Sequence, residues 1–145
     1  LKWDESYSNS GLYQLTLPDG YFQKAGINEA DSLTFSAASM EEVEEAADFT
    51  VRLKMNNGQS AEVSLSETLP LAPALHIQHT KTWFYQKSRY GNTHEPVLQT
   101  FHIPIEKFTA QGLDINRVNK IEFVFDKTDQ GKIFLDEIGV LKAIH

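Results

Sequence analysis

Aromatic and polar side chains lie close together in one stretch of the chain, between residues 82 and 95. Trp83, Tyr85 and Tyr90 offer flat faces that could stack on the apolar C–H face of a sugar ring. The stretch also holds side chains that form hydrogen bonds with hydroxyl groups, namely Arg89, Asn92 and Glu95. Stacking faces beside hydrogen-bonding groups are the chemistry of sugar recognition, and we predict a ligand site here.

Two other interpretations of this stretch remain open. In the first, Trp83 closes one end of the hydrophobic core and Arg89 holds the loop in place. In the second, the exposed aromatic rings belong to a protein interface, where such side chains are common.

A second candidate is an acidic residue in an apolar setting near the C-terminus. Asp136 lies in the run KIFLDEIGVL, which alternation predicts to be a strand over residues 132–141. The same alternation places Phe134, Asp136 and Ile138 on one face of that strand. An unpaired carboxylate buried among such neighbours would be costly, so Asp136 needs partners. It could cap a loop or accept backbone N–H groups at a sheet edge.

No group of residues has the spacing of a catalytic site. The chain has no cysteine, which removes thiolate catalysis and cysteine-bound zinc, and it has no Gly-x-Ser-x-Gly motif. His76 and His79 are three residues apart on a predicted strand and point to opposite faces. The acidic run over residues 41–45 is typical of a solvated surface. We therefore expect the isolated chain not to be an enzyme.

Composition narrows the class further. The 145 residues, 41% of them hydrophobic, predict one domain, residues 1–145, with a core of its own. A net charge of -7 with scattered Lys and Arg argues against nucleic acid and anionic membrane surfaces as partners. No apolar run approaches the roughly 18 residues of a membrane span. The chain begins at Leu1 rather than at methionine, so we expect a fragment of a larger protein.

Alternating apolar and polar residues indicate many short strands. The pattern predicts strands over residues 12–17, 32–36, 49–55, 60–66, 75–79, 97–103, 120–125 and 132–141. Turns are expected at 18–20 and 56–58, and the last two strands are expected to form a hairpin. Residues 40–47 predict a short surface helix or an acidic loop, and residues 105–108 one helical turn. This pattern favours an antiparallel sandwich or jelly roll.

The last third of the chain resembles the C-terminal half of galactose-binding-like jelly rolls, a group that includes several carbohydrate-binding module families. The resemblance rests on four motifs in order: Ile103-Pro104-Ile105-x-x-Phe108, Asp114-Ile115-x-x-Val118, Ile121-x-Phe123-x-Phe125 and Ile133-x-Leu135-Asp136-x-Ile138. It implies an all-β, antiparallel jelly-roll β-sandwich with at most one short helix. Domains of this type most often serve secreted bacterial glycoside hydrolases, lyases or lipase-like hydrolases as accessory modules.

The resemblance also implies a function, a cofactor and a location. The function is non-catalytic binding of a polysaccharide or glycan, with a catalytic domain in the same parent chain as a further partner. The location is extracellular, cell-surface or periplasmic in a bacterium. A structural Ca²⁺ would be bound by Asp136 with the N-terminal acidic residues Asp4 and Glu5. The alternative function is docking, without any sugar, onto a catalytic domain of the α/β-hydrolase type.

Overall fold

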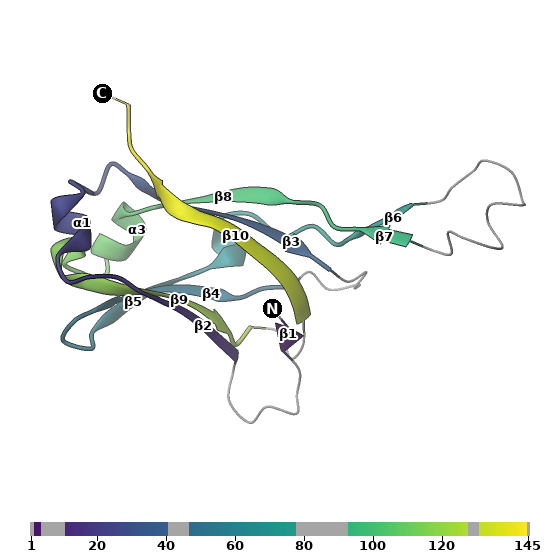
Figure 1. Ribbon diagram of the computed structural model, residues 1–145, viewed down its shortest axis with the longest axis horizontal. Helices are drawn as coiled ribbons and strands as arrows, with labels where there is room; N and C mark the ends of the chain where they lie inside the picture. Colours follow the sequence, from purple (N-terminus) through teal and green to yellow (C-terminus); the bar gives the residue numbers. More distant parts are fainter. Residues whose placement is uncertain (1, 4–10, 41–46, 78–92, 128–130, 145) are drawn as a thin grey trace, which may run out of the picture.

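The chain folds into two antiparallel four-stranded sheets that lie face to face (Figure 1). The computed structural model describes residues 2–3, 11–40, 47–77, 93–127 and 131–144. The first sheet has the order β1 (Lys2–Trp3), β10 (Gly131–Leu141), β3 (Ser32–Ser39) and β8 (Gln99–Pro104). The second has the order β2 (Gly11–Thr16), β9 (Val118–Phe125), β4 (Thr50–Met55) and β5 (Ser60–Ser64). The predicted all-β antiparallel jelly-roll β-sandwich is thus confirmed.

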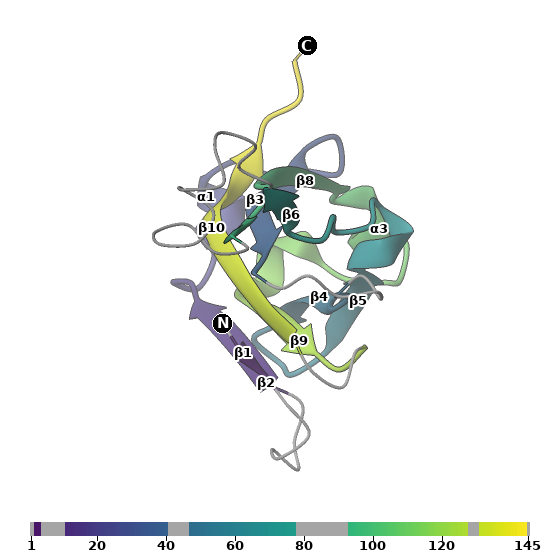
Figure 2. The same cartoon turned by 90° about the vertical axis from the view of Figure 1, so that its right-hand side faces the viewer.

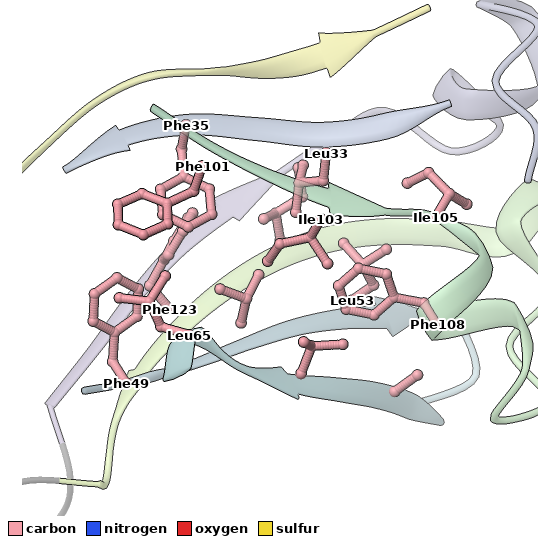
Figure 3. Packing of buried hydrophobic residues seen from close by; sticks show 14 of the residues in the cluster. Leu33, Phe35, Phe49, Leu53, Leu65, Phe101, Ile103, Ile105, Phe108 and Phe123 are labelled. Carbon is pink, nitrogen blue, oxygen red and sulfur yellow. The ribbon is translucent and has the colours of Figure 1, made fainter. Parts of the chain in front are cut away.

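Phenylalanine rings from both sheets meet in the core (Figure 3). Phe35 on β3 stacks on Phe101 of β8, with ring centroids 5.3 Å apart and planes 18° apart. It also meets Phe123 of β9, in the opposite sheet, edge-on at 5.2 Å. Strand alternation places these rings inward, because every second side chain of a strand points to the same face. The rings join the two layers of the sandwich.

Short turns connect the strands largely where the sequence predicts them. The hairpin between β4 and β5 turns at residues 56–58, where Gly58 has a φ of 89° that glycine adopts without steric cost. The predicted helical turn forms as α3 (Glu106–Thr109), but α1 (Tyr21–Lys24) was not expected, so the domain has two single-turn helices instead of at most one. Two 3-10 turns complete the set, η1 (Leu65–Glu67) and η2 (Ile115–Arg117). Residues 41–46 of the predicted helix lie outside the described residues.

The predicted hairpin between the last two strands is wrong. β9 lies in the second sheet between β2 and β4, whereas β10 lies in the first sheet between β1 and β3. Both edges of β9 are therefore occupied by other strands, and the chain crosses from one layer to the other after Phe125. A small two-stranded ladder, β6 (Leu75–Ile77) with β7 (Thr93–Glu95), extends beyond β8 in Figure 1 and was only half expected, because no strand was predicted at 93–95.

A β-bulge in β10 changes which of its side chains face the core. The register with β3 shifts between Asp136 and Gly139, and Glu137 has a positive φ of 52°. Beyond the shift, Ile138 packs against the core, and Glu137 is exposed. Strict alternation had assigned these two residues to the opposite faces, and that prediction is wrong because a bulge adds one residue to a strand.

Asp31, just before β3, holds the end of β10 in place. Its carboxylate is buried and accepts the backbone N–H groups of Asn28 and Ala143 at 3.0 and 2.8 Å. The Lys142 ammonium group lies 2.7 Å from the same carboxylate. The hydrogen bond from Lys142, followed by those from the two backbone groups, lowers the pKa of Asp31 from 3.8 to about 2.

Replacing Asp31 by asparagine should destabilise the domain at pH 7 and flatten its acid unfolding. A carboxylate with a lowered folded-state pKa stabilises the fold above pH 4, and this contribution is lost as the pH falls towards 2. The thermal midpoints of the wild type and Asp31→Asn should therefore converge between about pH 4 and pH 2. Lys142→Met removes the largest cause of the shift and should raise the pH at which convergence begins. Parallel midpoint curves would contradict the assignment.

Candidate functional site

The outer face of the first sheet brings polar side chains from three strands into rows. Directly paired residues of neighbouring antiparallel strands point to the same face. Asp136 of β10 pairs with Ser36 of β3, which pairs with Thr100 of β8. In the next row, Thr34 pairs with His102. These side chains point away from the core, since their neighbours in sequence, such as Phe35 and Phe101, point inward.

An exposed aromatic ring lies beside these rows. Phe134 pairs with Ala38, and 53% of Phe134 is exposed to solvent. Leu98, two residues before Thr100, is 61% exposed. We call the surface formed by Phe134, Asp136, Glu137, Thr100 and His102 the β10 face. It combines an apolar ring with carboxylate, hydroxyl and imidazole groups, all of which form hydrogen bonds.

Hydrogen bonds fix the shape of the β10 face at the bulge. The buried hydroxyl of Ser36 donates to Glu137 Oε2 at 3.2 Å and lies 3.3 Å from Thr100 Oγ1. The backbone N–H of Glu137 donates to Asp136 Oδ1 at 2.8 Å. Positive φ is uncommon for a residue with a side chain, so this bond helps to hold Glu137 in that conformation. The two carboxylates are thereby placed next to each other on a rigid strand.

Asp136 is exposed rather than buried among apolar neighbours, which corrects the prediction from the sequence. Its bond with the Glu137 N–H is of the kind that the structural interpretation of this residue describes. Within the described ranges, no group of three or more His, Cys, Asp or Glu side chains could hold a metal ion. Asp4 and Glu5, the other expected calcium ligands, lie outside the described residues, so calcium binding stays a prediction.

The predicted ligand residues lie almost wholly in residues 78–92, outside the described residues; this applies to Trp83, Tyr85, Arg89, Tyr90 and Asn92. Glu95 ends β7, and its backbone is described. The strands on either side of that segment, β6 and β7, pair with each other. β7 leads into β8 next to Leu98, so the segment emerges at the end of the first sheet that carries Phe134 (Figure 1).

Sequence reasoning did not single out Phe134, Thr100 and His102 as site residues. The signal was present, because alternation in β8 and β10 already placed them opposite the core residues Phe101 and Ile133. What the sequence did not supply was the order β10-β3-β8, which brings the two distant strands onto one surface.

The outer face of the second sheet has a different character. It carries a row of charged and amide groups across all four strands, made by Gln14, Glu122, Arg52 and Glu62. None of the residues paired on that face is aromatic. Stacking on a sugar ring is therefore possible on the β10 face and not on this one. In the described part of the chain, no helix is long and apolar enough to cross a membrane.

Comparisons with known proteins define the class of fold. The family 30 carbohydrate-binding module of a cellulosomal cellulase of Clostridium thermocellum superposes with a TM-score of 0.59 and 13% identity, over 90% of this chain and 66% of that chain. A second structure of a family 30 carbohydrate-binding module gives the same TM-score and identity, over 89% of this chain and 58% of that one. This chain thus spans less than two thirds of either.

The chain therefore has the fold of a carbohydrate-binding-module-type β-sandwich, as the resemblance of its last third predicted. No protein-family model matches the chain, and no curated protein sequence matches it.

Proposed function

We propose that this domain is a non-catalytic module that binds a polysaccharide or glycan on the β10 face. The observation that supports this most is the exposed ring of Phe134 beside Asp136 and Glu137 on a rigid sheet. The fold shared with family 30 carbohydrate-binding modules supports the same function.

Binding on this face would combine stacking with hydrogen bonds. The apolar C–H face of a pyranose ring would lie on Phe134, and the buried ring area would supply part of the affinity. Ring hydroxyls would donate to Asp136 and Glu137, while Thr100 and His102 would both donate and accept. Because Ser36 already holds Glu137, little side-chain freedom is lost on binding. The aromatic residues between 82 and 95 would form a second wall of the site.

The wider setting belongs to the same proposal. The module would be part of a secreted or surface enzyme of a bacterium and would hold a catalytic domain near its polysaccharide, raising the effective concentration of substrate. A bound Ca²⁺ would be structural, with Asp136, Asp4 and Glu5 as ligands.

Phe134→Ala should weaken glycan binding by about 10- to 100-fold while the thermal midpoint changes little, since base and sugar stacking on one ring contributes on the order of 1–3 kcal/mol. The measurement is binding of wild type and variant to a glycan array and to insoluble polysaccharides, with Ca²⁺ and with chelator. Tyr21→Ala is a matched control, because Tyr21 is 47% exposed on another part of the surface.

Two outcomes would contradict the proposed site or function. Equal binding by wild type and Phe134→Ala would remove the β10 face as the site, and loss with Trp83→Ala alone would assign the site to residues 82–95. Failure of the folded wild type to bind any glycan in either condition would contradict glycan binding itself and would favour docking onto a catalytic domain.

A further inference from the structure

One long edge of the first sheet has no neighbouring strand along most of its length. β3 pairs with β10 from Ile133 to Leu141. On the other side of β10, β1 pairs only with Gly131 and Lys132. Among the described residues, no strand covers Ile133–Leu141 on this side. The backbone N–H and C=O groups of that edge are thus available for a further strand.

The side chains beneath this edge are less buried than the rest of the core. Tyr13, Leu15 and Leu17, on and just after β2, point toward the sandwich interior but are only half-buried. On β9, the next strand of that sheet, Phe123 is fully buried and Ile121 only 4% exposed. The second sheet therefore extends one strand further than the first at this side, and the inner face of β2 lacks a partner across the core.

A cleft of about 350 Å³ fills the place of that missing partner. It opens between the free edge of β10 and the edge strand β2, with α1 at one end (Figure 2). Most of the side chains that line it are apolar, and they include Leu15, Leu17, Phe22, Ile138 and Val140. A cleft of this kind, next to unpaired backbone groups, suits a ligand that has both a backbone and alternating apolar side chains.

We propose that β10 accepts an extended polypeptide strand, antiparallel to it and in continuation of the β1 register. β1 already begins this pairing, because Trp3 lies opposite Gly131 and Lys2 opposite Lys132. Extending the same ladder in the N-terminal direction of β1 leads along β10 toward Leu141. The added strand would place every second side chain over the cleft and the others on the outer surface.

The bulge defines which positions of the added strand should be apolar. Leu135, Ile138 and Val140 of β10 face the cleft side of the sheet, so the residues that lie opposite them should be apolar. The bulge adds one residue to β10 relative to β3, and an added strand that skips this residue, as β3 does, keeps its alternation in phase from Ile133 to Leu141. The phase of the apolar residues is therefore fixed, and a shift by one position would expose all of them.

The test is to fuse eight residues directly before Leu1 in either of two phases. The segment (Val-Thr)₄ places threonine opposite Phe134 and valine opposite Leu135 and Val140. The segment (Thr-Val)₄ has the same composition in the opposite phase. We expect (Val-Thr)₄ to raise the thermal midpoint and to slow amide exchange in Ile133–Leu141 at least about tenfold, and (Thr-Val)₄ to do neither. Equal effects of the two segments, or no added protection of β10, would overturn the proposal.

A pair of neighbouring substitutions localises the effect. Val140→Ser removes an apolar side chain that lines the cleft, whereas Leu141→Ser removes one that is 55% exposed on the opposite face. In the (Val-Thr)₄ fusion, Val140→Ser should reduce the gain in thermal midpoint, and Leu141→Ser should leave it unchanged. The reverse order, or an equal loss, would place the added strand elsewhere. Should Val140→Ser fail to fold, the comparison of the two phases in the wild-type background still decides.

Discussion

Phe35→Ala is expected to destabilise the domain by about 3–5 kcal/mol, which is the usual cost of removing a buried phenylalanine side chain. Phe35 is fully buried and contacts rings from both sheets. Besides Phe101 and Phe123, it meets Phe49 of the second sheet with ring centroids 6.2 Å apart. Alanine would leave a cavity that rigid strands on both sides cannot close, so the transfer and cavity terms both apply. Urea unfolding monitored by circular dichroism measures the change.

Phe134→Ala is the matched control for this prediction. The same side chain is removed, but from the outer face of the first sheet, where 53% of it is exposed. We expect a change in the free energy of unfolding below about 1 kcal/mol, because exposed positions contribute little. Similar losses for both variants would mean that the ring of Phe134 is part of the packed structure, and the β10 face would lose its stacking platform.

The strands of this fold were predictable because their inner residues alternate strictly. In β4, Val51, Leu53 and Met55 alternate with Arg52 and Lys54, and every inner residue is buried. The turns also follow local chemistry, as at residues 56–58. What alternation does not encode is which strands become neighbours. The sheet exchange between β9 and β10 depends on long-range pairing with β3 and β4, so the hairpin expected from sequence proximity did not form.

The same limit applies to the candidate site. Asp136 was recognised as unusual, but its exposure depends on a bulge stabilised by the Glu137 N–H bond and by Ser36, about 100 positions away in the chain. The ring of Phe134 became a candidate platform only when β3 and β8 were found beside β10. Aromatic residues between 82 and 95 were chosen on composition alone, and they remain a prediction.

The outer face of the second sheet carries the other large expected effect. Glu122 is only 2% exposed, although it points away from the core. The Arg52 guanidinium covers it, with Nη1 lying 3.0 Å from Glu122 Oε2 and Nη2 lying 2.7 Å from Glu62 Oε1. Desolvation opposes the charge on Arg52, but the hydrogen bonds to Glu62 and Glu122 outweigh it and raise the pKa of Arg52. One arginine thus bridges a buried and an exposed carboxylate across three strands.

Arg52→Met should therefore cost about 2–4 kcal/mol, most of it from a buried carboxylate left without its partner. The apolar stem is kept, so packing changes little. Adding Glu122→Gln to Arg52→Met should recover more than half of the loss, because the second change removes the uncompensated charge. Lys54→Met, on the same face of the same strand, should change the free energy of unfolding by less than about 0.5 kcal/mol. Additive losses in the double variant would show that Arg52 stabilises the sheet through its own packing and not through Glu122.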